Sequence, residues 1–154
     1  MNGTLRFAII GLALIAVGLA YFRSQPLDVV PIGNAVRQDD FTYTITRVVK
    51  ERDAETVSYV VTIRVENDAK RVDYQWSDDT VFVTDAAGRH YHAIVSNTST
   101  AVDRAPIPPS ASAEYDLTFR LPADAKNPML RYWNGILMGD VFDGVAYSRT
   151  AVAL

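Results

Sequence analysis

The stretch VSYVVTIRVEN, residues 57–67, carries the clearest structural pattern in the chain. Apolar side chains occupy every second position from Val57 to Val65, and three of the four residues between them are polar. Because successive side chains of a β-strand point to opposite faces, this period of two indicates a strand with one buried face. The run ends at Asn67-Asp68, a pair typical of a turn.

The same alternation recurs on both sides of this stretch, and turn residues separate the runs. The clearest turn is Asp85-Ala86-Ala87-Gly88, where Gly88 can adopt the left-handed conformation. Strands with one apolar face bury those faces by stacking two sheets. We therefore predict an all-β fold, an immunoglobulin-like antiparallel β-sandwich of about seven strands, with a closed barrel as the alternative. The predicted strands are residues 41–46, 57–66, 72–76, 80–84, 89–95, 113–121 and 145–152.

The N-terminal segment differs from the rest of the chain in composition. Sixteen uncharged and mainly apolar residues lie between Arg6 and Arg23. As a helix, residues 5–22 would cover about 27 Å, the short end of what spans a bilayer core. We predict one hydrophobic helix here, a transmembrane signal anchor that binds the lipid bilayer through residues 5–22. A cleaved signal peptide is the alternative, since Gly18 and Ala20 are small residues at the positions that precede a cleavage after Ala20.

Three parts make up the predicted organisation. Residues 1–23 are the signal anchor or signal peptide, residues 24–34 form a proline-containing tether, and residues 35–154 form the sandwich domain. A short N-terminal tail usually stays inside. We therefore expect a single-pass protein of the cell membrane, with its C-terminal domain on the extracytoplasmic (periplasmic) side. Cleavage near Ala20 would instead give a secreted protein.

Composition excludes several classes of function. The chain has 15 Lys and Arg residues against 18 Asp and Glu residues, a formal net charge of −3. Acidic and basic residues are interspersed, so no basic stripe is present that could neutralise nucleic-acid phosphates. Without cysteine, the chain forms no disulfide, no thiolate metal cluster and no thiol nucleophile. No serine lies in a Gly-x-Ser-x-Gly context, and we expect neither a catalytic site nor a cofactor.

Four short motifs lie at the predicted turns. Val65-Glu66-Asn67 closes a strand on an asparagine turn, and residues 85–91 read DAAGRHY, an Asp-x-x-Gly-x-x-Tyr hairpin. Residues 108–112 read PPSAS and form a proline loop. The strand after that loop ends with residues 117–122, LTFRLP, in a Phe-x-x-Pro pattern.

These motifs make residues 35–130 resemble bacterial extracytoplasmic domains of the DUF4352 type, which have a telokin-like immunoglobulin fold. One departure from that group is Ser110, which follows Pro109 where a glycine is common. The resemblance implies a fold and an extracytoplasmic setting. It supplies no catalytic residues.

His90 and His92 are the candidate metal ligands. They lie two residues apart on a predicted strand, so their side chains point to one face. Two imidazoles at this spacing could hold zinc or copper if a carboxylate such as Asp85 closed the site. The alternative is a solvated strand face, with Tyr91 pointing into the core.

Residues 129–143 are rich in aromatic and Met side chains and are interrupted by two glycines. Such residues are enriched in the hot spots of protein interfaces. The pattern gives a hypothesis, a docking patch for a protein partner formed by Tyr132, Trp133 and Phe142. The alternative is a bulged core strand followed by a capping loop.

The leading interpretation is a non-enzymatic, membrane-anchored extracytoplasmic module that binds a protein partner or a ligand. Two alternatives stay open. One is a metal or small-ligand sensor domain that uses His90 and His92. The other is a secreted soluble domain with an enzymatic role that no motif reveals.

Overall fold

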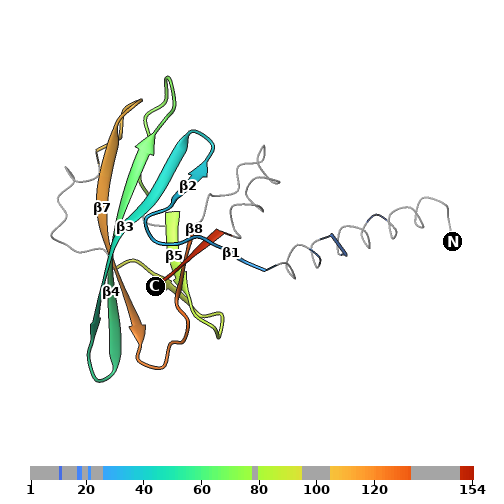
Figure 1. Ribbon diagram of the computed structural model, residues 1–154, viewed down its shortest axis with the longest axis vertical. Helices are drawn as coiled ribbons and strands as arrows, with labels where there is room; N and C mark the ends of the chain where they lie inside the picture. Colours follow the sequence, from blue (N-terminus) through green and yellow to red (C-terminus); the bar gives the residue numbers. More distant parts are fainter. Residues whose placement is uncertain are drawn as a thin grey trace.

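The computed structural model describes residues 26–77, 80–94, 105–132 and 150–154, together with Gly11, Val17, Gly18 and Tyr21. Two β-sheets pack face to face in this part of the chain, and Figure 1 shows them as two layers. The predicted β-sandwich is therefore confirmed. Its strands are β1 (Asp28–Val29), β2 (Ala35–Gln38), β3 (Phe41–Arg52), β4 (Thr56–Asn67), β5 (Val81–Thr84), β6 (His90–His92), β7 (Ser112–Pro122), β8 (Met129–Tyr132) and β9 (Thr150–Ala153).

One sheet has the strand order β2-β3-β4-β7 and is antiparallel throughout. The other has the order β1-β9-β8-β5-β6, and there β1 runs parallel to β9. The prediction of a purely antiparallel fold is wrong at that pair. The described residues form more strands than predicted, because β1, β2 and β8 have four residues or fewer and show too little alternation to be recognised.

The stretch that showed the clearest alternation forms β4, the strand between β3 and β7 in its sheet. It pairs with β7 from Thr56, opposite Pro122, to Glu66, opposite Ser112. Its inner face is fully buried in the middle of the strand, and each buried side chain of this size stabilises the fold by about 1.5–3 kcal/mol. The core residues of both sheets that have no exposed surface are Val61, Ile63, Val65, Val81, Val83, Phe119, Leu130 and Ala151.

A β-bulge explains why the alternation of β3 ends early. Ile45 pairs with Ile63 and Arg47 pairs with Thr62, so Thr46 has no residue opposite it. An extra residue moves the following side chains to the other face of the strand. Lys50 therefore shares the inner face with its cross-strand neighbour Tyr59, and its Nζ lies 5.2 Å from the Tyr59 ring centroid.

A cluster of aromatic residues fills one end of the core. The Tyr43 hydroxyl donates a hydrogen bond to the Tyr74 hydroxyl at 3.2 Å, and Trp76 stacks on Tyr115 with ring centroids 4.7 Å apart. The strand predicted over residues 72–76 is wrong, since Tyr74 makes only one isolated bridge there. The apolar alternation of this segment comes from a loop that anchors two aromatic rings in the core.

Residues 28–34 are bound to the sandwich, although the sequence assigned them to a free tether. Asp28 and Val29 pair with β9, and the N–H of Val30 donates to the carbonyl of Ala151 at 2.8 Å. The N–H of Gly33 donates to the carbonyl of Ile45 at 2.9 Å. The predicted tether of residues 24–34 is therefore corrected to a shorter segment that ends before β1.

Some of the predictions for the two ends of the chain concern residues outside the described part. The predicted helix is one of these, because most of the N-terminal segment 1–23 is not described. No helix within the described part is long and apolar enough to cross a membrane. Strand β9 begins at Thr150, near the end of the predicted strand 145–152, and residues 145–149 lie outside the described part.

Candidate functional site

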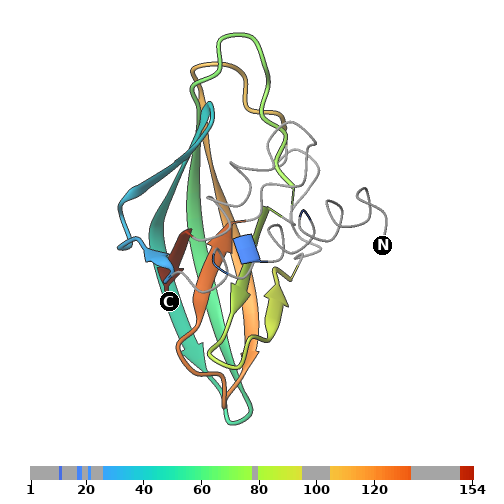
Figure 2. The same cartoon turned by 90° about the vertical axis from the view of Figure 1, so that its right-hand side faces the viewer.

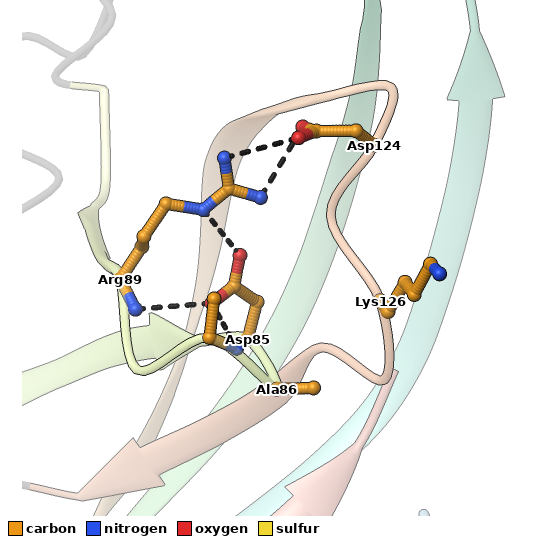
Figure 3. A pocket seen from close by; sticks show the side chains of 6 residues that line it. Asp85, Ala86, Arg89, Asp124 and Lys126 are labelled. Atoms are coloured by element: carbon orange, nitrogen blue, oxygen red, sulfur yellow. Dashed lines mark hydrogen bonds and ion pairs between the residues drawn. The ribbon is translucent and has the colours of Figure 1, made fainter.

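An open pocket lies where the β5–β6 turn meets the β7–β8 loop. Figure 2 shows both connections at the same end of the sandwich as the β3–β4 hairpin. The N–H of Ala86 donates to the carbonyl of Lys126 at 2.8 Å, which fastens the turn to the loop. The pocket has a volume of about 400 Å³ and is lined by Asp85, Ala86, Ala87, Arg89, Asp124 and Lys126 (Figure 3).

The Asp85 carboxylate is the centre of the polar contacts in this pocket. Its Oδ1 accepts hydrogen bonds from the backbone N–H groups of Ala87 at 2.9 Å and Arg89 at 3.0 Å. Its Oδ2 accepts from Arg89 Nε at 2.6 Å and from the Tyr91 hydroxyl at 3.0 Å. Gly88 has a φ of 76°, which confirms the left-handed conformation expected there. The Asp-x-x-Gly turn is thus folded around one buried carboxylate.

Arg89 joins this buried carboxylate to an exposed one. Its Nη1 and Nη2 donate to the two carboxylate oxygens of Asp124 at 3.3 and 3.2 Å, while its Nε donates to Asp85. The Asp85 side chain is 1% exposed and the Asp124 side chain is 73% exposed. Because solvent screens exposed ion pairs, the contact with Asp85 contributes more to stability than the contact with Asp124.

The surroundings of Asp85 stabilise its ionised form. Burial of the carboxyl group opposes ionisation, but the hydrogen bonds from the side chain and backbone of Arg89 and from Tyr91 outweigh it and lower the pKa of Asp85 from 3.8 to about 2. The hydrogen bond with Asp85 raises the pKa of Arg89. Burial, together with the hydrogen bond to Asp85, raises the pKa of Tyr91. At neutral pH the group therefore consists of an anion, a cation and a neutral phenol.

These contacts leave the Asp85 carboxylate poorly suited to catalysis or metal binding. A general base works best with a pKa near the working pH, and a metal ligand needs a lone pair directed at the ion. Both oxygens of Asp85 already accept two hydrogen bonds each. Figure 3 shows the Lys126 side chain directed away from Arg89 and Asp124. The arrangement holds the β5–β6 turn against the β7–β8 loop.

His90 and His92 lie on β6 with exposed side chains. The Phe82 ring on β5 stacks on His90, with ring centroids 5.0 Å apart and an interplanar angle of 9°, and it lies 6.4 Å from His92. The Asp85 carboxylate binds Arg89 and does not form a metal site with the two histidines. Within the described ranges no three His, Cys, Asp or Glu residues are grouped to hold a metal ion.

Of the three residues of the hypothesised docking patch, only Tyr132 lies in the described part of the chain. Tyr132 ends β8 and is 1% exposed, with its ring centroid 5.7 Å from that of Tyr43. Its burial raises the pKa of its hydroxyl. Tyr132 is therefore a core residue, which corrects its assignment to a docking surface. Trp133 and Phe142 lie outside the described residues.

Sequence reasoning missed two polar anchors. Asn67, 1% exposed, donates from Nδ2 to the carbonyls of Val72 and Ile107, both at 2.8 Å, and its Oδ1 accepts from the N–H of Ala69 at 3.0 Å. The sequence indicated only a turn at Asn67. Asp124 had no local signal, because its partner Arg89 lies 35 residues away in the chain.

Comparisons with known proteins identify the fold. No family model and no curated protein matches the chain. Among solved structures, the secreted protein MPT63 of Mycobacterium tuberculosis is 11% identical, with a TM-score of 0.57 over 85% of this chain and 99% of that one. An uncharacterised β-sandwich protein from Clostridium difficile 630 is 11% identical, with a TM-score of 0.52 over 85% and 97% of the two chains. The yjhA protein of Bacillus subtilis is 11% identical, with a TM-score of 0.54 over 80% and 98%. Likeness at this level of identity shows that the β-sandwich fold is shared.

Proposed function

We propose that this chain is a non-enzymatic interaction or ligand-binding module held on the extracytoplasmic side of a membrane by its N-terminal segment. The observation that carries the proposal is the run of sixteen uncharged residues between Arg6 and Arg23, which has the length and composition of a short membrane-spanning helix. The description of MPT63, which shares the fold, as a secreted protein agrees with an extracytoplasmic setting.

The chemistry of the described polar groups supports a non-enzymatic role. In the pocket, Arg89 pairs with both Asp85 and Asp124, and Asp85 keeps a pKa of about 2. A site for acid–base catalysis needs a group whose protonation changes near the working pH. The paired charges of the pocket therefore favour a structural function. We assign the binding of a partner or ligand to other parts of the domain surface.

The motifs at the turns support an immunoglobulin-like domain of the DUF4352 type as the finer description of the fold. In this chain, Asp85 and Tyr91 of the Asp-x-x-Gly-x-x-Tyr motif hydrogen-bond to each other, and Asn67 holds two loops together. Motif residues with such structural roles are expected to recur in proteins that share a fold. Trp133 and Phe142 stay the proposed contacts for a protein partner, on the ground of their composition.

Protease accessibility tests the proposed location. In spheroplasts of a Gram-negative host that expresses the full chain, an added protease should degrade the β-sandwich domain while a cytoplasmic control stays intact. Washing the membranes with alkaline carbonate should leave the protein in the membrane fraction. Protection from the protease would contradict the orientation. Release by carbonate, with a mature N-terminus at Tyr21, would replace the anchor by a signal peptide cleaved after Ala20.

A further inference from the structure

Exposed apolar side chains are concentrated near the N-terminal end of the described chain. Seven large hydrophobic residues are exposed in the described part, and five of them lie between Val17 and Ile32. Of the other two, Val72 lies on a loop and Ile94 forms an isolated bridge with Thr118 of β7. Single exposed apolar residues are ordinary on protein surfaces, but such a concentration along one short segment indicates a contact surface.

Two of these side chains, Val29 in β1 and Leu27 directly before it, lie on the same side of the chain. Successive residues of an extended segment point in opposite directions, so Leu27 and Val29 share a side and Asp28 points away from it. Leu27 is 38% exposed and Val29 is 47% exposed. Val30 points the other way and packs against the core. Ile32, 46% exposed, follows at the turn after β1.

Only a short length of chain separates these residues from the apolar segment 5–22. Because β1 is paired with β9, only the four residues between Phe22 and Leu27 separate the apolar segment from the start of the sandwich. Even fully extended, five Cα–Cα steps cover at most about 18 Å. The headgroup layer on each side of a bilayer core is about 5–8 Å thick. A chain anchored through residues 5–22 therefore holds β1 close to the membrane surface.

We propose that Leu27, Val29 and Ile32 form a membrane-contact surface that enters the headgroup layer beside the anchor. The inference rests on the proposed anchoring by residues 5–22. The occupant is the lipid bilayer, because the chain leads directly from a membrane-spanning length of apolar sequence into these three side chains. Contact of this kind fixes which edge of the sandwich faces the membrane and directs the opposite edge, with β7, toward other partners.

The absence of native cysteine allows a direct test. Val29→Cys and Ile32→Cys in the full chain are labelled with an environment-sensitive nitrobenzoxadiazole fluorophore. Ile94→Cys is the matched control, because Ile94 and Ile32 have the same exposed fraction of 46%, and Val72→Cys is a second control. The proteins are reconstituted into vesicles of phosphatidylethanolamine and phosphatidylglycerol, and sedimentation with the vesicles is measured on the same samples. Each labelled protein must keep the wild-type melting temperature.

The surface predicts blue-shifted emission and strong quenching by doxyl-labelled lipid at positions 29 and 32, with at least a severalfold weaker effect at 94 and 72. If the protein sediments with the vesicles but the emission and quenching at position 32 equal those at position 94, the proposed membrane-contact surface is wrong. The proposed anchoring by residues 5–22 is then retained. If the protein does not sediment, the contact and the anchor both fail. Disulfide formation between unlabelled Val29→Cys chains under a mild added oxidant, with no lipid quenching of the labelled protein, would assign the surface to a second copy of the chain and overturn the proposal.

Discussion

At the scale of single residues, Asp85 makes the stability of the fold depend on acid pH. Its pKa is 3.8 in an unperturbed carboxyl group and about 2 in the folded chain, so the unfolded state binds the proton more tightly. The stabilisation from Asp85 is therefore complete above pH 4 and is lost as the pH falls from about 4 to about 2. We expect Asp85→Asn to lower the Tm by several degrees at pH 7, and this difference from the wild type should shrink toward pH 2.

Thermal melts of both proteins between pH 2 and pH 7 measure this difference. Asp73→Asn, at an exposed loop position, is the control and should follow the wild-type curve. A difference between Asp85→Asn and the wild type that stays constant down to pH 2 would show that the ionised carboxylate is not the stabilising species.

Tyr132 allows the core assignment and the docking assignment to be separated at one position. Its ring is buried, and its hydroxyl has no hydrogen-bond partner among the described residues. Removing the whole ring with Tyr132→Ala should cost about 3–5 kcal/mol of unfolding free energy, whereas Tyr132→Phe should be neutral or slightly stabilising. Urea denaturation of the two variants checks both values. Equal stability of Tyr132→Ala and the wild type would contradict the core assignment and support the docking assignment of Tyr132.

At the scale of elements, the proline loop before β7 contains a strained position. Ser110 has a φ of 62°, in the left-handed region that costs an ordinary residue about 1–2 kcal/mol. A glycine is common at this place in the domains that the sequence resembles. We expect Ser110→Gly to stabilise the fold by about 0.5–1 kcal/mol, because relief of strain exceeds the added freedom of the unfolded chain.

Ser112→Gly is the matched control for this change. Ser112 begins β7 and pairs with Glu66, so glycine there should destabilise the protein by about 0.5–1 kcal/mol. Chemical denaturation should therefore move the two variants in opposite directions from the wild type. A loss of stability in both would mean that the side chain of Ser110 contributes more than its backbone strain costs.

The length of an element decided how well the sequence predicted it. The period-two pattern found β4 and β7, because each presents about five alternating pairs and is buried on one face. It followed β3 only as far as the bulge at Thr46, where the inner face changes from odd to even positions. The short strands β1, β2 and β8 gave no period. Strands β1 and β8 are placed by pairing with strands far away in the sequence, whereas β2 pairs with the next strand, β3.

The candidate site was predictable only in its local part. The Asp-x-x-Gly pattern identified the turn at Asp85, since a short acceptor side chain and a left-handed glycine are local requirements. The pairing of Arg89 with Asp124 and the burial of Tyr132 depend on which loops and sheets meet in space. Two histidines spaced two residues apart on a strand, such as His90 and His92, do not show whether a third metal ligand lies near them in the fold.

At the scale of the whole molecule, the domain begins earlier than the composition indicated. A protein that starts at residue 26 keeps β1 and the hydrogen bonds of Val30 and Gly33, whereas one that starts at residue 35 loses them and leaves β9 without its parallel partner. The lost burial of Val30 and the lost backbone hydrogen bonds together lower the free energy of unfolding by about 2–4 kcal/mol. We expect the shorter protein to unfold at a Tm lower by about 10 °C and to self-associate through the uncovered edge of β9. Calorimetry and analytical ultracentrifugation of the two proteins check this.

Equal melting temperatures would mean that β1 adds nothing to the stability of the sandwich. Residues 24–34 would then again be a free tether, too long to hold the domain against a membrane.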